Sequence, residues 1–110
     1  MIYKALIAGD ATRAEREGVT SAKVDLADGF VHFSTRAQLA ETLRLHFGGQ
    51  AAVVLYEFEV ANLLGELRWE ASRGGDLFPH LYGPLDVRTA ARRWTLSLGP
   101  DDAPELPNDL

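Results

Sequence analysis

The chain has 110 residues, a formal net charge of −5 and no cysteine. This length predicts one domain, and a hydrophobic fraction of 46% is enough for a packed core without disulfide bonds. The absence of cysteine also excludes zinc–thiolate sites. The acidic balance argues against an extended nucleic-acid surface, because such a surface needs an excess of Lys and Arg.

No apolar run approaches the about 20 residues that a transmembrane helix needs. The apolar stretch at residues 2–8 is short and an acid follows it at Asp10, which is unlike a secretory signal. We therefore expect a cytoplasmic protein with no membrane partner. The composition leaves the oligomeric state open.

The N-terminal third alternates between apolar and polar segments. Residues 2–8 are predicted to form a strand, and Gly9 ends it. Residues 11–18 suit a short helix or an ordered loop, and residues 19–28 show no clear period. Aromatic and β-branched types at residues 29–33 predict a second strand.

The clearest helix follows that strand. A serine–threonine pair at 34–35 supplies a helix N-cap, and glycines at 48–49 provide the stop. Between them, Leu39, Leu43 and Phe47 recur every four residues. This spacing puts all three on one helical face.

Four further strands are predicted, at residues 51–60, 67–71, 77–82 and 91–98. Glutamates that alternate with apolar residues near the end of the first of these indicate a solvent-facing side there. The proline inside residues 77–82 indicates an edge, a strand start or a bulge. The tail, residues 99–110, contains three prolines and four acids, and we expect it to be frayed.

One main helix among about six short strands predicts a small α+β domain over residues 1–98 with a mainly antiparallel sheet. Neither a glycine-rich dinucleotide motif nor a P-loop follows any predicted strand.

The first candidate site segment is residues 28–34, which read Asp-Gly-Phe-Val-His-Phe-Ser. His32 lies inside an otherwise apolar strand, where a neutral imidazole can orient a polar ligand group. Ser34 can cap the helix or point into the same pocket. The alternative is a core histidine bonded to a backbone carbonyl, with Ser34 as a cap alone.

The second segment is residues 78–84, where aromatic residues flank His80. Aromatic walls with a few polar groups are typical of small-molecule pockets. The alternative is a rigid turn that packs Phe78 and Tyr82 into the core.

The third feature is the pair Trp69 and Glu70. Trp69 is either a core residue or a stacking surface for a ring. Glu70 is an exposed strand carboxylate, a general base or the partner that fixes a histidine tautomer. Two histidines and Glu70 are a chemically possible metal set, but nothing in the spacing requires it, so we expect no metal.

The segments 28–34, 67–70 and 78–84, in this order, resemble the family called domain of unknown function 952 over roughly residues 2–98. Many members have a tryptophan after the first strand, whereas this chain has none before Trp69. By fold that family is grouped with the ADP-ribosyltransferases, and it is most similar to the branch that includes RNA 2'-phosphotransferases. The resemblance implies a split, strongly curved sheet with NAD in the cleft.

The resemblance also implies roles for individual residues. His32 would bond the nicotinamide-side ribose, and His80 would be the matching histidine of a second core strand. Glu70 precedes His80 in the chain, so it does not match the transferase glutamate, which follows the second motif. The candidate catalytic residues are His32 and His80, and the candidate ligand-binding residues are Phe33, Ser34, Arg36, Trp69, Glu70 and Tyr82.

Two functions of different classes remain. One is NAD-dependent transfer of an ADP-ribosyl or phosphate group, with NAD as a substrate. The other is a non-catalytic module that binds a nucleotide or another small molecule. The lack of an evident catalytic acid or base other than histidine favours the second.

Overall fold

The computed structural model describes residues 1–19, 23–100 and 102–110. The α-helices are α1 (Ala8–Glu17), α2 (Lys23–Asp28) and α3 (Arg36–His46). The strands are β1 (Ile2–Leu6), β2 (Val31–His32), β3 (Val53–Phe58), β4 (Glu66–Ala71), β5 (Leu77–Tyr82) and β6 (Arg92–Leu96). Short 3-10 helices are η1 (Val60–Asn62), η2 (Arg73–Gly75) and η3 (Val87–Thr89). No helix within these ranges is long and apolar enough to cross a bilayer.

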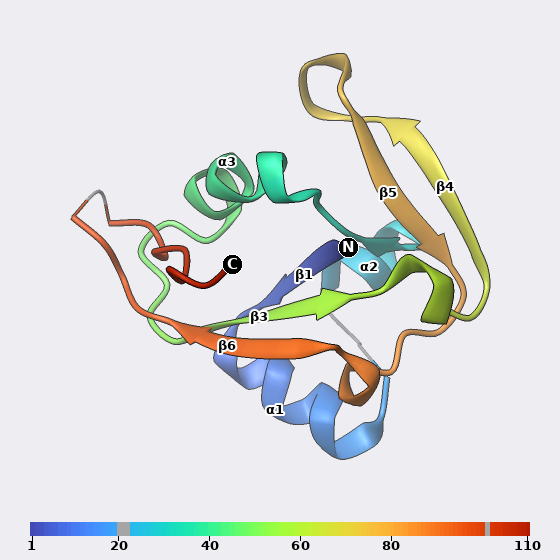
Figure 1. Cartoon of the computed structure of the whole chain (residues 1–110), viewed down its shortest axis with the longest axis horizontal. Coiled ribbons are helices and arrows are strands. Elements are labelled where there is room, and N and C mark those ends of the chain that lie inside the picture. The colour runs from blue at the N-terminus through green and yellow to red at the C-terminus, as the bar shows by residue number, and fades with distance from the viewer. Residues whose placement is uncertain (20–22, 101) are drawn as a thin grey trace.

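The strands form two antiparallel three-stranded sheets, in the orders β1-β3-β6 and β2-β5-β4 (Figure 1). One backbone pair, Tyr3 and Ser34, bridges them through two N–H···O bonds of 2.9 Å. The chain enters α3 directly after Ser34, so the ladder between the sheets stops there. The predicted α+β class and the antiparallel, split arrangement are therefore confirmed.

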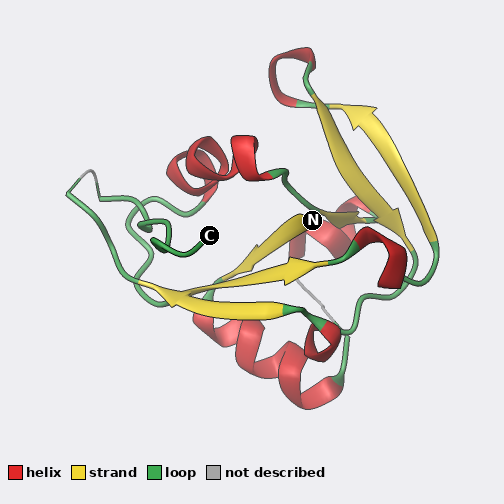
Figure 2. Cartoon of the chain, in the orientation of Figure 1, coloured by secondary structure: helices red, strands yellow, loops and turns green. Residues whose placement is uncertain are grey.

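The β1-β3-β6 sheet is covered on both faces, and all six residues of β3 are buried. Ile2 and Leu6 pack in one cluster with α1 and the smaller sheet. Leu39 and Leu43 of α3 pack in the other cluster, with Phe47 against it. Figure 2 shows α1 and α3 on opposite sides of this sheet. The predicted apolar face of α3 is confirmed.

The expectation of a single main helix was wrong. Helix α1 has 10 residues, nearly as many as the 11 of α3, and ends at Gly18 in the left-handed conformation (φ 85°). It buries only the small residues Ala11 and Ala14, so the sequence carries no large apolar period there. Helix α2 lies in the stretch without a clear period, of which residues 20–22 are outside the described residues.

Two other expectations were also wrong. Glu57 and Glu59 were expected to face solvent; Glu59 is exposed, but Glu57 is 4% exposed and accepts bonds of 2.8 and 2.9 Å from Arg92. The tail was expected to be frayed, but Leu106 and Leu110 pack against the core, and Trp94 Nε1 donates to Asp109 Oδ1 at 3.0 Å. The partner of Glu57 is an arginine distant in sequence, and the tail packs on an apolar surface formed by other elements. Local composition predicts neither contact.

Candidate functional site

The pairing of β2 with β5 brings the two predicted histidines together. His32 and His80 are direct partners in the antiparallel ladder, and their ring centroids lie 5.4 Å apart. Directly opposed residues project from the same face of a sheet. The sequence predicts that both histidines face one cleft; the structure places them on one face of the sheet, but of the two only His32 lines the larger cavity described below.

Phe30 covers this histidine pair. Its ring centroid lies 4.2 Å from that of His80, 4.6 Å from that of His32 and 5.3 Å from that of Tyr82. Phe30 stands two residues before His32, which is the spacing of one face of a strand. Because of this cover, His80 is only 5% exposed.

Both ring nitrogens of His32 contact carboxylates. Nδ1 lies 2.7 Å from Asp25 Oδ1, and Nε2 lies 2.9 Å from Asp28 Oδ2. The His32 backbone N–H also donates to Asp25 Oδ1, at 3.1 Å. A neutral imidazole has one N–H, so both contacts are hydrogen bonds only when the ring is an imidazolium. This geometry favours a cationic His32.

Asp25 is shared between His32 and the buried Lys4. Lys4 Nζ lies 3.0 Å from Asp25 Oδ1 and 2.8 Å from Oδ2, and both side chains are 5% exposed. Burial acts to raise the pKa of Asp25, but the hydrogen bond from His32 and the charge of Lys4 outweigh it, so this pKa is lowered. Burial lowers the pKa of Lys4, and Asp25 opposes that shift.

His80 has a different partner arrangement. Its Nδ1 donates to Glu70 Oε1 at 2.8 Å, and the Tyr82 hydroxyl donates to the same oxygen at 2.7 Å. The bond from Tyr82, followed by that from His80, lowers the pKa of Glu70. Of the alternatives for Glu70, the structure thus places it as the partner that fixes a histidine tautomer. None of the described residues bonds His80 Nε2.

A cavity of about 500 Å³ lies along the free edge of β1, where the two sheets diverge. Ser34 lies in its wall, and the Ser34 hydroxyl is 3.0 Å from that of Thr42. The cap of α3 is Thr35, which forms a capping box with Gln38, so Ser34 points into the pocket instead. The residues that line the cavity are Tyr3, Lys4, Ala5, Leu6, Ile7, Asp10, His32, Phe33, Ser34, Leu39, Thr42, His46, Phe47 and Ser72.

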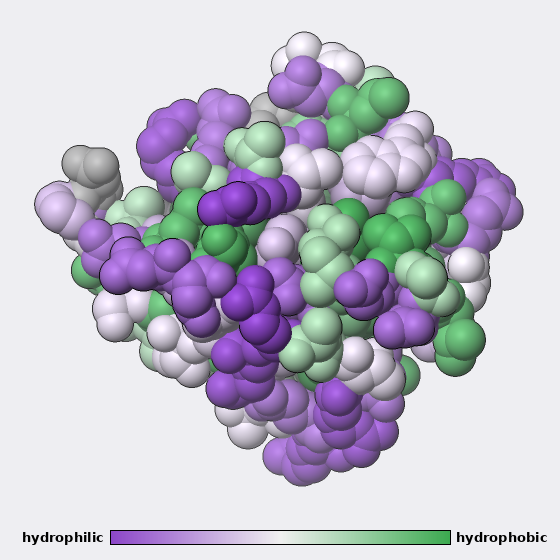
Figure 3. All heavy atoms as spheres, in the orientation of Figure 1, coloured by the Kyte–Doolittle hydropathy of each residue, from purple (hydrophilic) through white to green (hydrophobic). Residues whose placement is uncertain are grey.

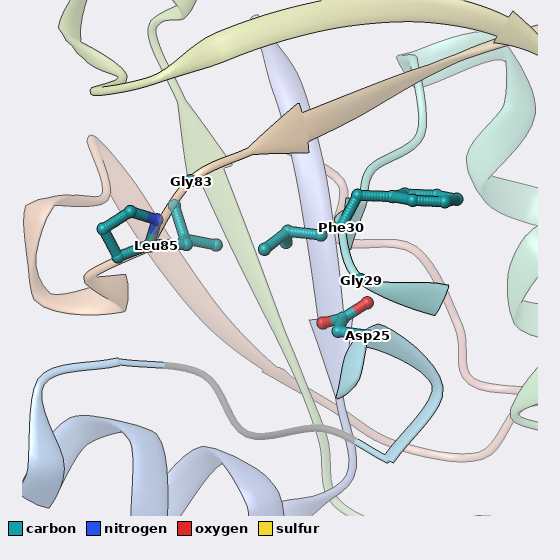
Figure 4. Close-up of a pocket in the computed structure, with 7 residues that line it drawn as sticks. Asp25, Gly29, Phe30, Gly83 and Leu85 are labelled. Carbon is teal, nitrogen blue, oxygen red and sulfur yellow. The ribbon is translucent and has the colours of Figure 1, made fainter. Parts of the chain in front are cut away.

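A smaller hollow of about 240 Å³ is lined by Asp25, Gly29, Phe30, Val31, Gly83, Pro84 and Leu85 (Figure 4). The Asp25 carboxylate reaches it from α2, while the Phe30 ring turns away from Gly83 and Leu85. Its lining is otherwise apolar or glycine. The larger cavity, with polar groups from several elements, is therefore the better candidate for a ligand site.

The chain matches the family described as "Protein of unknown function (DUF952)" over residues 7–92. It belongs to this family. The crystal structure of protein CC0527 from Caulobacter crescentus is 45% identical, with a TM-score of 0.87 over 94% of this chain and 92% of that chain. The solution NMR structure of CC0527 is 44% identical, with a TM-score of 0.84 over 99% and 95% of the two chains. No curated protein matches.

In this DUF952 chain, two predicted ligand residues lie away from the histidines. Trp69 is opposite Pro79, one position from Glu70, and therefore projects from the other face of β4. It is 48% exposed, and Leu77 and Leu64 are exposed as well. Figure 3 shows hydrophobic side chains gathered on this side of the molecule, near η1 and the β4–β5 hairpin. Arg36 is an exposed residue in the first turn of α3.

Sequence reasoning missed Asp25, and it gave no role to Asp28 and Phe30, although both lie in the first candidate segment. Asp25 lies seven residues from His32 in a segment without a period, so no local pattern predicts their contact. One usable signal was Lys4, a lysine inside an apolar strand, which requires a buried anion nearby.

Within the described residues, no cluster of three or more His, Asp or Glu side chains is arranged to hold a metal ion.

Proposed function

We propose that the cleft between the two sheets binds NAD and that the domain transfers the ADP-ribosyl group of NAD to an acceptor. The observation that carries this proposal is the facing pair His32 and His80, of which His32 lines the cavity at the split. A volume of about 500 Å³ is within the about 300–1,000 Å³ typical of small-molecule sites. The resemblance to the DUF952 family implies a fold related to the ADP-ribosyltransferases, and this relation supports the proposal.

Two of the carboxylates beside the histidines are placed to stabilise a positive charge on a ligand. Asp28 and Glu70 are half-exposed carboxylates, with 47% and 37% of their side chains accessible. Tyr82 makes a cation–π contact with Arg68, whose guanidinium lies 4.5 Å from the centroid of the tyrosine ring. A nicotinamide ring carries a positive charge in NAD, and the ribose carbon becomes cationic as that ring leaves. Negative groups aimed at developing positive charge lower such a barrier.

In this proposal His32 positions the ribose. Its Nε2–H donates to Asp28, which is exposed enough for a ribose hydroxyl to take its place. The backbone N–H groups of Phe33 and Ser34 are already bonded, to Pro79 and Tyr3. The Ser34 hydroxyl is bonded to that of Thr42, but a hydroxyl has a donor and two lone pairs, so it keeps the capacity to recognise the nicotinamide amide.

The test is a thermal-shift titration with NAD, ADP-ribose and nicotinamide, combined with chromatographic detection of released nicotinamide. NAD at 100 times its dissociation constant should stabilise the wild type by about 2.7 kcal/mol. His32→Ala should abolish this stabilisation, while Trp69→Ala, on the other face of β4, should retain it. A folded wild type that neither NAD nor ADP-ribose stabilises would overturn the proposal.

A non-catalytic binding module is the second candidate. It is favoured by the fact that both ring nitrogens of His32 are already engaged, so that residue is not free to move a proton. It predicts stabilisation by ADP-ribose or a nucleotide with no nicotinamide release from NAD under any condition.

A further inference from the structure

We infer that His80 is the general base of this site and that its Nε2 accepts the proton of a neutral hydroxyl acceptor, either water or an alcohol. This inference rests on the proposed transfer of an ADP-ribosyl group, and it identifies which chemical class of acceptor that reaction takes.

The tautomer of His80 is fixed by its neighbours. Glu70 Oε1 accepts from both His80 Nδ1 and the Tyr82 hydroxyl, at 2.8 and 2.7 Å. A carboxylate that receives two donors is ionised, so the proton of a neutral His80 resides on Nδ1. The lone pair is then on Nε2, and this is the tautomer that a general base needs.

The Nε2 atom is available. None of the described residues bonds it. The His80 residue is 5% exposed, lines neither of the two cavities and lies against the Phe30 ring, so an acceptor has to approach Nε2 beside that ring. Binding of an acceptor at Nε2 breaks no hydrogen bond among the described residues.

The neighbouring histidine supports the division of roles. His32 contacts a carboxylate at each nitrogen and so has no lone pair to offer when it is cationic. The His32 ring lies 5.4 Å from that of His80, so the two histidines can act on one bound ligand. Once His80 accepts a proton, Glu70 stabilises the new charge.

The carboxylates decide the acceptor class. Asp28 and Glu70 face the same site, so a carboxylate acceptor would meet like charges. A carboxylate acceptor would also have no proton for His80 to remove. A neutral hydroxyl avoids the repulsion and must lose a proton as it attacks, which is the step that a base accelerates.

The reaction balances without a further co-reactant. The bond between the ribose C1' and the nicotinamide nitrogen breaks, and its electron pair neutralises the pyridinium ring, which leaves as nicotinamide. The acceptor oxygen forms a bond to C1' and transfers its proton to His80 Nε2. His80 then releases that proton to water.

The experiment measures nicotinamide release from NAD in buffer, with methanol and with acetate, across pH 5–9, with mass spectrometry of the products. For the wild type we expect release that rises with pH to a plateau, methyl ADP-riboside in methanol, and no acetyl product. His80→Gln should slow release by about 10²–10⁴-fold and remove this pH dependence. Because His80 is buried, melting curves with and without NAD check that the variant folds and binds.

Glu70→Gln provides an independent test at a half-exposed position that folding tolerates. It keeps the side-chain shape but removes the charge that stabilises protonated His80. We expect kcat to fall while KM for NAD changes little. The matched control Glu17→Gln removes the charge of an exposed glutamate in α1, outside this site, and should retain the rate.

The outcomes separate the two proposals. If NAD fails to stabilise the wild type, the proposed function is wrong. If NAD binds but no nicotinamide is released, or His80→Gln and Glu70→Gln leave rate and pH profile unchanged, the base assignment is wrong and NAD binding stands. An acetyl product without a methyl product overturns the acceptor class.

Discussion

The two sheets have the same number of strands and the same antiparallel pairing, but they differ in what covers them. The β1-β3-β6 sheet has apolar clusters on both faces, and its central strand is entirely buried. In the β2-β5-β4 sheet, every residue of β4 is at least partly accessible. The inner face of this sheet contributes Val31 and Leu81 to the core, while its other face carries the histidines.

The two sheets therefore have different roles: the larger one contributes mainly to stability, and the smaller one carries the groups of the candidate site. The larger sheet neutralises its buried charges within the fold, as Lys4 does with Asp25 and Glu57 does with Arg92. In the smaller sheet, His80 Nε2 has no hydrogen bond to any described residue and Glu70 is half-exposed, as is Asp28 of the adjoining helix α2. We therefore expect substitutions in the first region to change unfolding free energy, and those on the histidine face to change ligand binding.

The largest effect should come from the residue that links the two regions. Asp25→Ala leaves the 4%-exposed Lys4 without its anion, and breaking a buried pair in this way costs about 3–5 kcal/mol. Urea unfolding measures it. The double variant Lys4→Met with Asp25→Leu should recover much of the loss, because neither charge remains. A loss below about 1 kcal/mol for Asp25→Ala would show that this pair is not buried as described.

The helix behind the larger sheet gives the next test. Leu43 is fully buried in the cluster beside β3, so Leu43→Ala should cost about 2–5 kcal/mol. Leu45 is in the same helix but 45% exposed, and Leu45→Ala should stay within about 0.5 kcal/mol. Chemical denaturation of both variants checks the pair. Equal losses would mean that the helix presents a different face to the sheet.

The pH dependence of stability should reflect the same linking residue. The pKa of Asp25 is lowered in the folded state, so the folded chain binds fewer protons than the unfolded chain over the interval between the two values. Its contribution is complete above the ordinary Asp value of about 3.9 and is lost as pH falls through the lower folded value.

The measurement is unfolding free energy between pH 2 and pH 6. Asp25→Asn should flatten the fall below about pH 4 relative to wild type. Asp86→Asn is the control: the pKa of Asp86 is also lowered, by the hydrogen bond from Arg88, but that pair is partly exposed and is expected to contribute about 0–1 kcal/mol. A larger change for Asp86→Asn would reverse the expected ranking.

The smallest effect is expected at Trp69. Its side chain is on the face of β4 opposite to Glu70 and is 48% exposed. Trp69→Ala should therefore change stability by about 0.5 kcal/mol or less and leave any NAD-dependent thermal shift unchanged. Loss of that shift would show that the ligand also contacts this face.

Much of the fold follows from local pattern. The four-residue spacing of Leu39, Leu43 and Phe47 identified the buried face of α3, and the aromatic and β-branched runs located the strands. Helix α1 was harder to predict because it buries only alanines. Small side chains give little contrast between faces, so a helix that packs closely through them leaves a weak periodic signal.

The sequence by itself determined the segments that meet: a histidine in each of two strands, and a glutamate in a third. Only the tertiary structure decided how the surroundings of the two histidines differ. His32 meets Asp25 from a helix seven residues away, and His80 meets Glu70 across a hairpin. The protonation and free atoms of an imidazole depend on which groups reach its two nitrogens. Those groups come from other elements of the fold. The protonation of each histidine is therefore set by tertiary packing and cannot be predicted from the residues that flank it in the sequence.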